Sequence, residues 1–465
     1  MDSRQRKSLT RREMLRLTAT AAGSSAIAAI LAACGAPPPA AAPPPTSAPA
    51  SGDAPPAPVE PSPTPVTAEV FGSSSAKVKI RYWTILSSVD GIVMNDLVRK
   101  FSQENPDIAV ESLQGLTDFI QKLQASSISD TAPDVALIRH TYIGPFVGKN
   151  MLSPIDPGEL ELAGIRSSDY DPTVWNFTQF EGKQYTVPLD IHCHAMVYNK
   201  KIYADNNIAV PTTLDEWLSA TRTVTKGDIV GYNTFALGSG AQEYMTWFIF
   251  GLWRQFGVEM ITADNKAGFN TPDGIAAVKW MKDIQDAGNP NNVPTGDIQR
   301  TGQVASWTDG PWISTLFFDK TKSPAADDLD VAPLPQKDLN NKAVWGQSHQ
   351  FALPRQGKPD AERRAATLKF VQWMTQHGVD WAKAGQVPAH NAARDEALSS
   401  DDHILQKLRV WASQLPYVAY IPAHPMLLEV MPRIAANVEG ALLNQWSVEE
   451  GLRKAEEEVN QILIG

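Results

Sequence analysis

The chain has 465 residues, of which 43% are hydrophobic and 20% are charged, and its formal net charge at pH 7 is -10. A chain of this length and apolar content can form two or three globular domains with sizeable cores. The acidic balance argues against a nucleic-acid-binding surface, which needs a basic patch, and no basic run later in the chain supplies one.

Residues 1–33 have the pattern of an export signal. A positive leader precedes an apolar run from Leu17 to Ala33, which is shorter than the ~20 apolar residues of a transmembrane span. Arg11 and Arg12 resemble the twin-arginine export motif, with an ordinary positive leader as the alternative. The run Leu-Ala-Ala-Cys that ends at Cys34 resembles a bacterial lipobox, in which the cysteine is lipidated. We therefore expect an exported protein, anchored to the outer face of the cytoplasmic membrane by lipidated Cys34.

Residues 34–76 begin with this cysteine and continue as a linker rich in Pro, Ala, Ser and Thr. Such a composition has no periodic apolar pattern and favours an extended tether. The chain has only two cysteines, so if Cys34 carries lipid, Cys193 has no partner for an internal disulfide. We expect Cys193 to be buried.

From Lys77 the pattern predicts strands and helices in alternation. Strands are expected at 77–83, 108–110 and 134–138, and helices at 93–101 and 119–128. This order predicts a parallel α/β lobe. Ligands of such sheets lie beyond the carboxyl ends of the strands, which points to the residues from Trp83 onward and to Arg139–Tyr142.

The segment from Gly182 to Lys200 is predicted to connect two lobes. A strand ends at Pro188, which cannot donate a backbone hydrogen bond, and a second apolar strand follows from Ala195 to Tyr198. Between them stand His192 and His194, whose side chains can bind a ligand. The segment is therefore interpreted as an interlobe crossover beside a cleft.

A second α/β lobe is predicted to follow. Its expected helices include one opened by the capping box Thr213–Glu216, a very apolar one at 248–256, and one from Pro272 to Gly288. Asp309-Gly-Pro predicts a turn between two tryptophans. Further along, a strand at 344–349 is expected to enter the first lobe, a helix to contain Leu368, Val371 and Met374, and an amphipathic helix to begin at Val448.

Nine segments resemble, in the same order, the extracellular solute-binding proteins of ABC importers, in the sugar-binding family typified by maltose-binding protein. Each segment alone is a weak signal, but their order behind a lipobox is specific for the family and not for the sugar. The segments are 80–84, 101–111, 132–136, 151–155, 182–188, 197–200, 211–217, 309–312 and 332–335.

The resemblance implies an α/β, two-lobed periplasmic-binding-protein fold of type II, a hinged clamp with the ligand cleft between its lobes. The first lobe is expected to comprise 77–189 and 341–385, and the second 190–340 and 386–465. The implied function is to capture a sugar or oligosaccharide and deliver it to an ABC permease. We expect a monomer without catalytic activity, cofactor or bound metal, and without a nucleic-acid partner.

The family's binding sites combine aromatic rings with polar groups, as a sugar ring requires. Trp312 matches the indole that the family places against a sugar, and Tyr244 with Gln242 falls where a ring-contacting aromatic and a polar group are found. His192 replaces a ligand-binding carboxylate. The candidate binding residues are Trp83, His140, Tyr142, Asp190, His192, Gln242, Tyr244, Trp307, Asp309, Trp312, Trp345 and Gln347.

The sequence leaves three other interpretations to consider. A metal at His192-Cys193-His194 is disfavoured because Cys193 would point away from both imidazoles on a strand, and a closed site needs about four ligands. No catalytic signature is found, although acidic pairs keep a carbohydrate-cleaving enzyme as a rival. A binder of another small solute, such as a polyol, a polyamine or a metal chelate, is the alternative within the binding-protein class.

Overall fold

A computed structural model describes residues 68–116, 118–233, 237, 242–294 and 296–464. The predicted export signal, Cys34 and the linker up to residue 67 lie outside the described residues. Gln242 is placed as part of a helix, but its side chain is not described. Among the described helices, none is both long and apolar enough to cross a bilayer.

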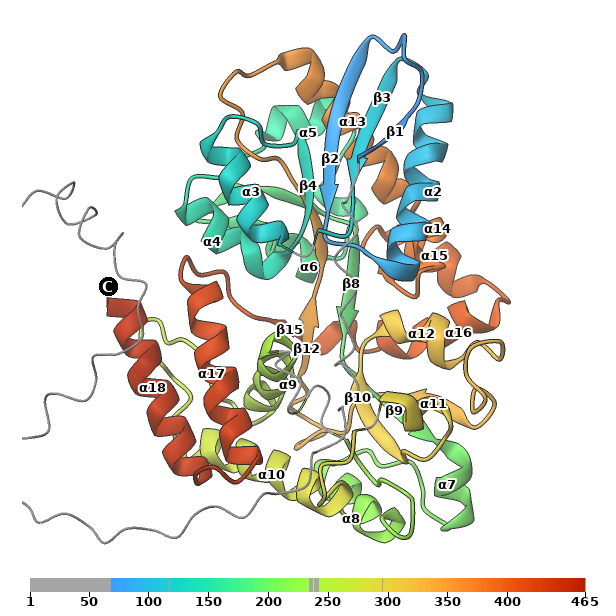
Figure 1. Ribbon diagram of the computed structural model, residues 1–465, viewed down its shortest axis with the longest axis vertical. Coiled ribbons are helices and arrows are strands. Elements are labelled where there is room, and N and C mark those ends of the chain that lie inside the picture. The colour runs from blue at the N-terminus through green and yellow to red at the C-terminus, as the bar shows by residue number, and fades with distance from the viewer. Residues whose placement is uncertain (1–67, 117, 234–236, 238–241, 295, 465) are drawn as a thin grey trace, which may run out of the picture. The chain divides into compact units, whose positions relative to one another are not determined.

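The first lobe contains a six-stranded sheet in the order β1-β3-β2-β4-β13-β7, in which β2 is parallel to β3 and β4 (Figure 1). Three helices pack against it. The strands are β1 (Glu69–Phe71), β2 (Val78–Thr84), β3 (Ile108–Leu113), β4 (Val135–Arg139), β7 (Thr186–Pro188) and β13 (His349–Ala352), and the helices are α2 (Ser88–Glu104), α3 (Phe119–Ile128) and α13 (Ala361–Gln376). The predicted alternation of strands and helices in this lobe is confirmed.

The structure corrects the expected boundary between the linker and the fold. Within the predicted linker, β1 pairs antiparallel with β3, and Phe71 lies opposite Val110. Phe71 is only 5% exposed, so the fold begins before Lys77. A three-residue strand is too short to show the two-residue period by which strands are recognised.

Smaller elements complete the first lobe around this sheet. Asp156 and Glu159 form a capping box at the start of one of the short helices. These elements are η1 (His140–Tyr142), α4 (Ile143–Gly148), α5 (Pro157–Ala163), η2 (Ser167–Asp169), α6 (Pro172–Asn176), β5 (Gln179–Phe180), β6 (Lys183–Gln184) and α14 (Gly378–Ala382).

The second lobe contains a three-stranded sheet in the order β10-β9-β11, and a four-stranded sheet β14-β8-β12-β15 lies between the lobes (Figure 1). Most of the apolar side chains of the second lobe belong to one large buried cluster. The strands are β8 (Asp190–Cys193), β9 (Ala195–Asn199), β10 (Ser306–Asp309), β11 (Leu329–Ala332), β12 (Val344–Gln347), β14 (Val387–Pro388) and β15 (Val418–Tyr420).

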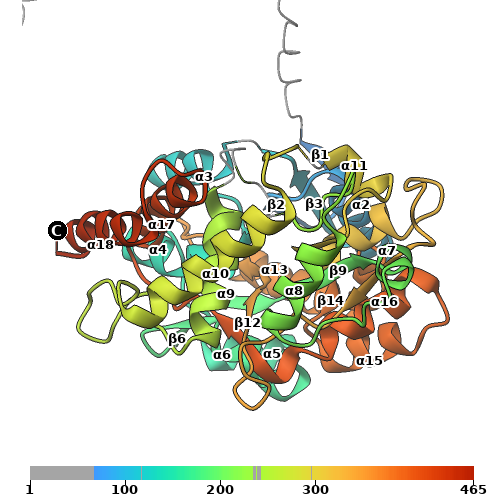
Figure 2. The same cartoon turned by 90° about the horizontal axis from the view of Figure 1, so that it is seen from below.

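Helices surround the second lobe, and α17 and α18 lie side by side at one edge (Figure 2). The predicted capping box of Thr213 and Glu216 is present. Sequence reasoning did not predict α17, which contains Pro432. The helices are α7 (Lys200–Asp205), α8 (Leu214–Val224), α9 (Gln242–Gln255), α10 (Pro272–Gly288), α11 (Gly296–Arg300), η3 (Pro311–Ile313), α12 (Ser314–Phe317), α15 (Asn391–Ser399), α16 (His403–Ala412), η4 (Leu415–Tyr417), α17 (Leu427–Leu442) and α18 (Val448–Ile464).

Two antiparallel segments connect the lobes. The first is Thr186–Asn199. The sequence predicts two strands here, but the segment contains three, β7, β8 and β9. His192 therefore lies within β8 rather than between strands. The second segment contains β12 and β13 instead of the single strand expected at 344–349. Leu189 N–H donates to His349 O over 2.9 Å, and His194 N–H donates to Trp345 O over 3.2 Å. The two crossovers therefore support each other along their length.

A third contact between the lobes involves Ile421 and His424, in a segment that resembles, without a firm residue match, one that lines the cleft in the solute-binding family. His424 instead packs against α4, where a Cβ on Gly144 would lie 2.6 Å from the His424 backbone nitrogen. The ring of His140 is within 3.3 Å of Ile421 O. Only a glycine permits this close approach of the two backbones.

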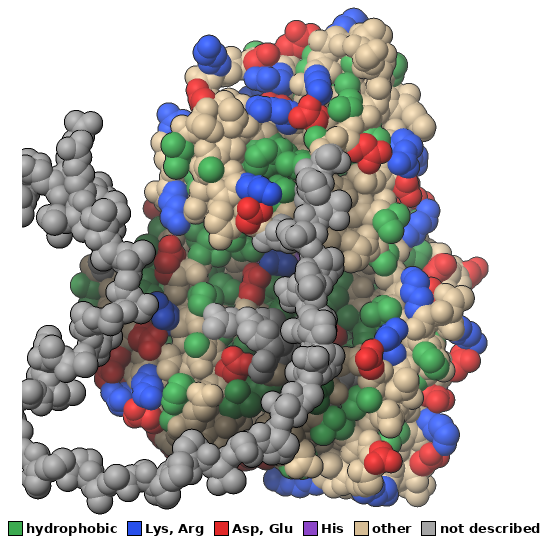
Figure 3. Space-filling view, in the orientation of Figure 1, with side chains coloured by type: hydrophobic (Ala, Val, Ile, Leu, Met, Phe, Trp, Pro, Cys, Tyr) green, Lys and Arg blue, Asp and Glu red, His purple; other side chains and the backbone are tan. Residues whose placement is uncertain are grey.

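The face of the molecule seen in Figure 3 carries Lys and Arg side chains interspersed with Asp and Glu side chains over both lobes. The described residues on that face show no continuous basic patch. This distribution agrees with the acidic composition of the chain.

Replacing Phe101 by Ala should lower the free energy of unfolding by about 3–5 kcal/mol, because it leaves a cavity in the first-lobe core. Phe101 is 0% exposed, and its ring lies 5.0 Å from that of Phe370 and 5.6 Å from that of Trp373. Urea denaturation measures the change. Ile92→Ala on the same helix is the control, since Ile92 is 65% exposed and its loss should change stability by about 0.5 kcal/mol or less. Equal effects of the two changes would contradict the packing described here.

Candidate functional site

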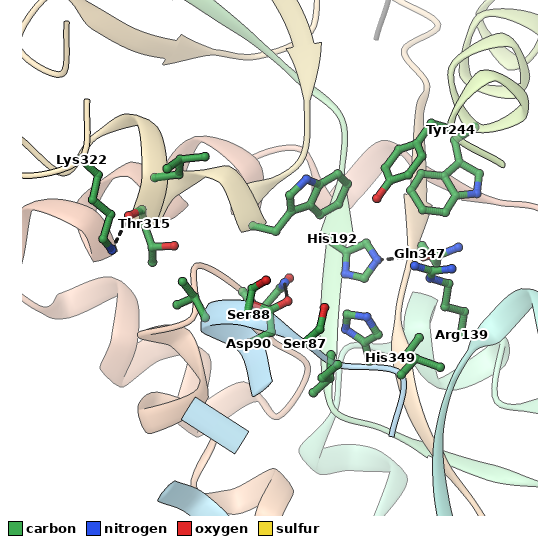
Figure 4. A pocket seen from close by; sticks show the side chains of 17 residues that line it. Ser87, Ser88, Asp90, Arg139, His192, Tyr244, Thr315, Lys322, Gln347 and His349 are labelled. Carbon is green, nitrogen blue, oxygen red and sulfur yellow. Dashed lines mark hydrogen bonds between the residues drawn. The ribbon is translucent and has the colours of Figure 1, made fainter. Parts of the chain in front are cut away.

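A cavity of about 560 Å³ is lined by residues of both lobes and of both crossovers (Figure 4). The first lobe contributes the turn after β2 and the start of α2, from Ile85 to Asp90, and Arg139 at the end of β4. These are the carboxyl ends of parallel strands, where the sequence predicts a ligand. The crossovers and the second lobe form the rest of the lining.

Aromatic rings form the second-lobe wall of the cavity. Trp312 lies on η3, and Tyr244 and Trp247 lie on α9. The Trp312 ring centroid is 6.5 Å from that of Tyr244 and 6.2 Å from that of Trp247. Trp247 in turn stacks on the buried Trp345, with centroids 4.4 Å apart and planes 15° apart. The wall is therefore supported from behind by a further indole.

Gly310 allows the observed position of the Trp312 ring. A Cβ at residue 310 would lie 2.1 Å from a ring carbon of Trp312. The Asp-Gly-Pro turn that the sequence predicts thus has a second role, because any larger residue at position 310 would displace the indole from the cavity wall.

The crossovers supply the floor of the cavity. His192 on β8 and His349 on β13 present their rings one beside the other, with centroids 5.0 Å apart (Figure 4). Gln347 on β12 lies with its Oε1 3.2 Å from His192 Nε2. All three side chains line the cavity. The floor therefore consists of imidazole and amide groups that can exchange hydrogen bonds with a solute.

Asp190 is completely buried beneath this floor. Its carboxylate accepts hydrogen bonds from the His349 backbone N–H and the His349 Nδ1, each over 2.7 Å, and from Trp381 Nε1 over 2.9 Å. Burial alone would raise the pKa of Asp190, but His349 and the neighbouring His192 hold it well below its usual range. Asp190 is thus a charged group that positions the floor, rather than a group at the cavity surface.

The first-lobe side of the cavity is polar and carries two charged groups. Burial raises the pKa of Asp90 to about 6, and its carboxylate accepts a hydrogen bond from Gln386 over 3.4 Å. Arg139 forms an ion pair of 2.6 Å with Glu243 on α9 and lies 5.5 Å from the ring centroid of Trp247. Arg139 therefore links the first lobe to the aromatic wall of the second.

Four of the twelve candidate residues line the cavity: His192, Tyr244, Trp312 and Gln347. The side chain of Gln242 lies outside the described residues. The other candidates have different positions. Trp345 is 0% exposed behind Trp247, and Trp307 is 0% exposed, with its ring 5.3 Å from that of Phe317 in the second-lobe core. Strand β10 is covered on both faces, so neither face of it is free to meet a solute.

Three first-lobe candidates also differ from expectation. Trp83 packs against an apolar cluster of the first lobe rather than lining the cavity. His140 is buried against Ile421, and burial lowers its pKa to about 3. Tyr142 is buried with its hydroxyl 3.1 Å from Arg139 Nη1. Proximity to the carboxyl end of a strand thus identified the region, but tertiary packing decided which side chains face the cavity.

Asp309 lies behind the aromatic wall. It borders a much smaller cavity of about 10 Å³, which Tyr244, His194 and Trp312 also line. Its carboxylate is buried and accepts the Gly310 N–H over 2.9 Å. Burial raises the pKa of Asp309 to about 7. The candidate Asp309 is therefore separated from the main cavity by the Trp312 ring.

Several lining residues were missing from the sequence-based candidates. Most of them lie next to strand ends, with Trp247 on α9 and Lys322 in the segment after α12, and no sequence motif distinguishes them from core residues. These residues are Ser87, Ser88, Asp90, Arg139, Trp247, Lys322, His349 and Gln386. The strand-end rule points to the first four of them, whereas Trp247 directly precedes the very apolar helix expected at 248–256 and was not singled out.

Cys193 lies on the opposite side of β8 from His192. It is 1% exposed, and its Sγ lies 3.5 Å from Trp411 O. The sulfur therefore cannot share a ligand with His192, as the strand geometry predicts.

Comparison with known families now defines the class of the protein. Residues 86–381, more than half of the chain, match the family model of bacterial extracellular solute-binding proteins. The chain belongs to this family. Both family and fold are those of substrate-binding proteins. A binding protein of Brucella abortus is 21% identical over 393 residues, which cover 81% of this chain and 91% of that protein.

A maltotriose-binding protein of Pyrococcus abyssi is 24% identical over 307 residues, 64% of this chain and 62% of that protein. Among solved structures, the cyclic alpha-maltosyl-1,6-maltose binding protein of Arthrobacter globiformis is 24% identical with a TM-score of 0.70, over 83% of this chain and 99% of that chain. The GacH receptor of Streptomyces glaucescens, solved with acarbose, is 18% identical. It also has a TM-score of 0.70, over 83% of this chain and 99% of that chain. These structures confirm the predicted two-lobed fold.

Replacing Asp309 by Asn should alter how stability depends on pH. The folded protein keeps the Asp309 proton up to about pH 7, whereas the ordinary pKa of 3.8 applies to the unfolded chain. Wild-type stability therefore falls as the pH rises from about 4 to about 7, and the variant, which cannot ionise, lacks this loss.

Urea denaturation of both proteins at pH 4.5 and pH 8 tests this expectation. The variant should gain about 2–4 kcal/mol relative to wild type between the two pH values. A difference that is independent of pH would show that the Asp309 carboxylate ionises in the fold without penalty.

Proposed function

We propose that this protein binds a sugar or oligosaccharide in the cavity between its lobes and delivers it to the permease of an ABC importer. The observation that carries the proposal is the arrangement of the cavity. The aromatic wall of Trp312, Tyr244 and Trp247 borders the same cavity as the polar floor and a first-lobe rim, which is formed by Ser87, Ser88 and Asp90.

This arrangement suits the chemistry of a pyranose. One face of a sugar ring presents C–H groups, which pack on flat aromatic surfaces, and its rim presents hydroxyls, which need donors and acceptors. His192 and Gln347 on the floor and Ser87, Ser88 and Asp90 on the rim supply both kinds of polar group. A volume of about 560 Å³ is within the range of ~300–1,000 Å³ that is typical of small-molecule sites.

Relatives support the same solute class. The names of the similar proteins include maltotriose, a cyclic maltosyl-maltose and acarbose as ligands, and all of these are carbohydrates or close mimics. None of these names fixes the sugar for this chain, since a likeness at 18–24% identity supports the shared fold and not the same ligand.

Ligand contacts from both lobes would stabilise a closed form. A solute that shifts the lobes from 1:99 to 99:1 closed must bind the closed form about 5.5 kcal/mol more tightly. We further propose that lipidated Cys34 anchors the protein to the outer face of the membrane, and that the Pro- and Ala-rich segment after it holds the two lobes near the permease.

A thermal-shift screen over sugars, polyols, polyamines and metal chelates tests the solute class. The Trp312→Ala variant should lose at least tenfold in affinity for the sugar that binds, because it loses the ring surface of the wall. Trp446→Ala is the matched control, since Trp446 is also partly exposed but packs against α17 outside the cavity. Stabilisation by polyols or polyamines alone, or unaltered sugar affinity of Trp312→Ala, would contradict the proposal.

Replacing Cys34 by Ser tests the proposed anchor in a bacterial host with lipoprotein processing. The wild-type protein should incorporate a palmitate analogue and sediment with membranes, because the cysteine sulfur carries the lipid. The variant should lose the label. Cys193→Ser is the control and should keep it, since Cys193 is buried in the fold. Equal labelling of wild type and Cys34→Ser would exclude the lipid anchor.

A further inference from the structure

Asp190, His192 and His349 meet where the two crossovers run side by side. Each offers a ligand atom, and these three atoms lie within 4.8 Å of one another. Asp190 Oδ2 is 2.7 Å from His349 Nδ1, and Asp190 Oδ1 is 3.5 Å from His192 Nδ1. These spacings bracket the ~3.3 Å expected between two ligand atoms that are each about 2.0 Å from a tetrahedral metal ion.

The hydrogen bond of His192 leaves one of its nitrogens without a partner. His192 Nε2 lies 3.2 Å from Gln347 Oε1, which can only accept, so Nε2 is the nitrogen that donates in this pair and Nδ1 is left for another partner. His192 is only 2% exposed, so its Nδ1 is buried. This nitrogen has no hydrogen-bond partner among the described residues.

The nearest group to this nitrogen is another acceptor. Asp190 Oδ1 lies 3.5 Å from Nδ1, so a carboxylate oxygen and a ring nitrogen face each other at a distance too long for a close hydrogen bond. Such a juxtaposition is unfavourable unless a cation lies between them, because buried acceptors without a donor cost free energy and like partial charges repel. The geometry thus requires either a proton on Nδ1 or a metal ion.

We propose that Asp190, His192 and His349 bind a divalent transition-metal ion of the zinc class, with one coordination position open to the cavity. Two imidazoles and one carboxylate are ligands that such ions prefer. Three protein ligands with one open position are typical of metal sites that bind a further molecule. Both imidazoles line the cavity, so a solute can reach the open position.

The surroundings of the three ligands fit this assignment. The His349 backbone N–H and Trp381 Nε1 donate to the Asp190 carboxylate, and Gln347 accepts from His192, so that Asp190 and His192 are each oriented by an outer partner. Asp90 on the cavity wall provides a second carboxylate nearby, and with Asp190 it can balance the charge of a divalent ion.

The neighbouring His194 does not belong to the site. Its ring lies 4.4 Å from that of Trp345, and burial lowers its pKa to about 3. The site therefore differs from the His192-Cys193-His194 arrangement considered from the sequence, because its second imidazole, that of His349, comes from the other crossover.

Zn²⁺ is titrated by calorimetry into the full chain after chelator treatment. One ion per chain is expected. His192→Ala and His349→Ala should each weaken binding by at least about 100-fold, since even the loss of an outer partner costs about 10–100-fold. His194→Ala, which removes an equally buried imidazole from the same crossover, is the control and should keep the wild-type affinity. Thermal melting of each variant verifies that it is folded.

The visible absorption of bound Co²⁺ gives a second readout that needs no variant. Nitrogen and oxygen ligands without thiolate should produce d–d bands and no sulfur charge-transfer band, since Cys193 lies outside the site. Absence of stoichiometric Zn²⁺ binding to wild type would overturn the proposal and leave a proton on His192 as the cation. Binding that persists in His192→Ala, or that is lost equally in His194→Ala, would overturn it as well.

The metal site does not rest on the proposed sugar-binding function, and the two are tested separately. The solute screen is run on chelator-treated and on Zn²⁺-loaded protein. If the protein binds a sugar but not Zn²⁺, only the proposed metal site is excluded. If it binds Zn²⁺ but no sugar, only the proposed sugar-binding function is excluded.

Discussion

The buried carboxylate of Asp190 joins three parts of the chain that are far apart in sequence. It lies on β8 and accepts hydrogen bonds from His349 on β13 and from Trp381 on α14. Because an unpaired carboxylate cannot remain buried, these donors must stay in place whenever the fold is intact. The alignment of the two crossovers, and with it the position of the imidazoles on the cavity floor, depends on this one group.

The cavity combines groups of opposite character because its walls belong to different lobes. The aromatic wall is supported by the second-lobe core, where Trp345 stacks on Trp247. The first-lobe rim is formed by loops at strand ends, where backbone and hydroxyl groups are available. Arg139 is the direct link between them, since it pairs with Glu243 and lies over the Trp247 ring. A solute that bridges wall and rim therefore contacts both lobes at once.

Much of the fold could be predicted from the sequence because local patterns specify it. The two-residue period of β2, the capping box at Thr213 and the apolar face of the helix that begins at Val448 each depend on neighbours within a few residues. Elements that lack such a pattern were missed. The short β1 has no visible period, and α17 contains Pro432, which usually argues against a helix.

The sequence by itself determined the family, the two α/β lobes and the importance of the segment around His192, since these follow from local patterns and from the order of motifs. Among the candidate residues that the sequence named, only the tertiary structure decided that Trp312 and Tyr244 line the cavity, whereas Trp307 and Asp190 are buried. It also brought His349 beside His192. The physical reason is that side-chain exposure and long-range contacts depend on how distant strands align, and no local pattern encodes that alignment.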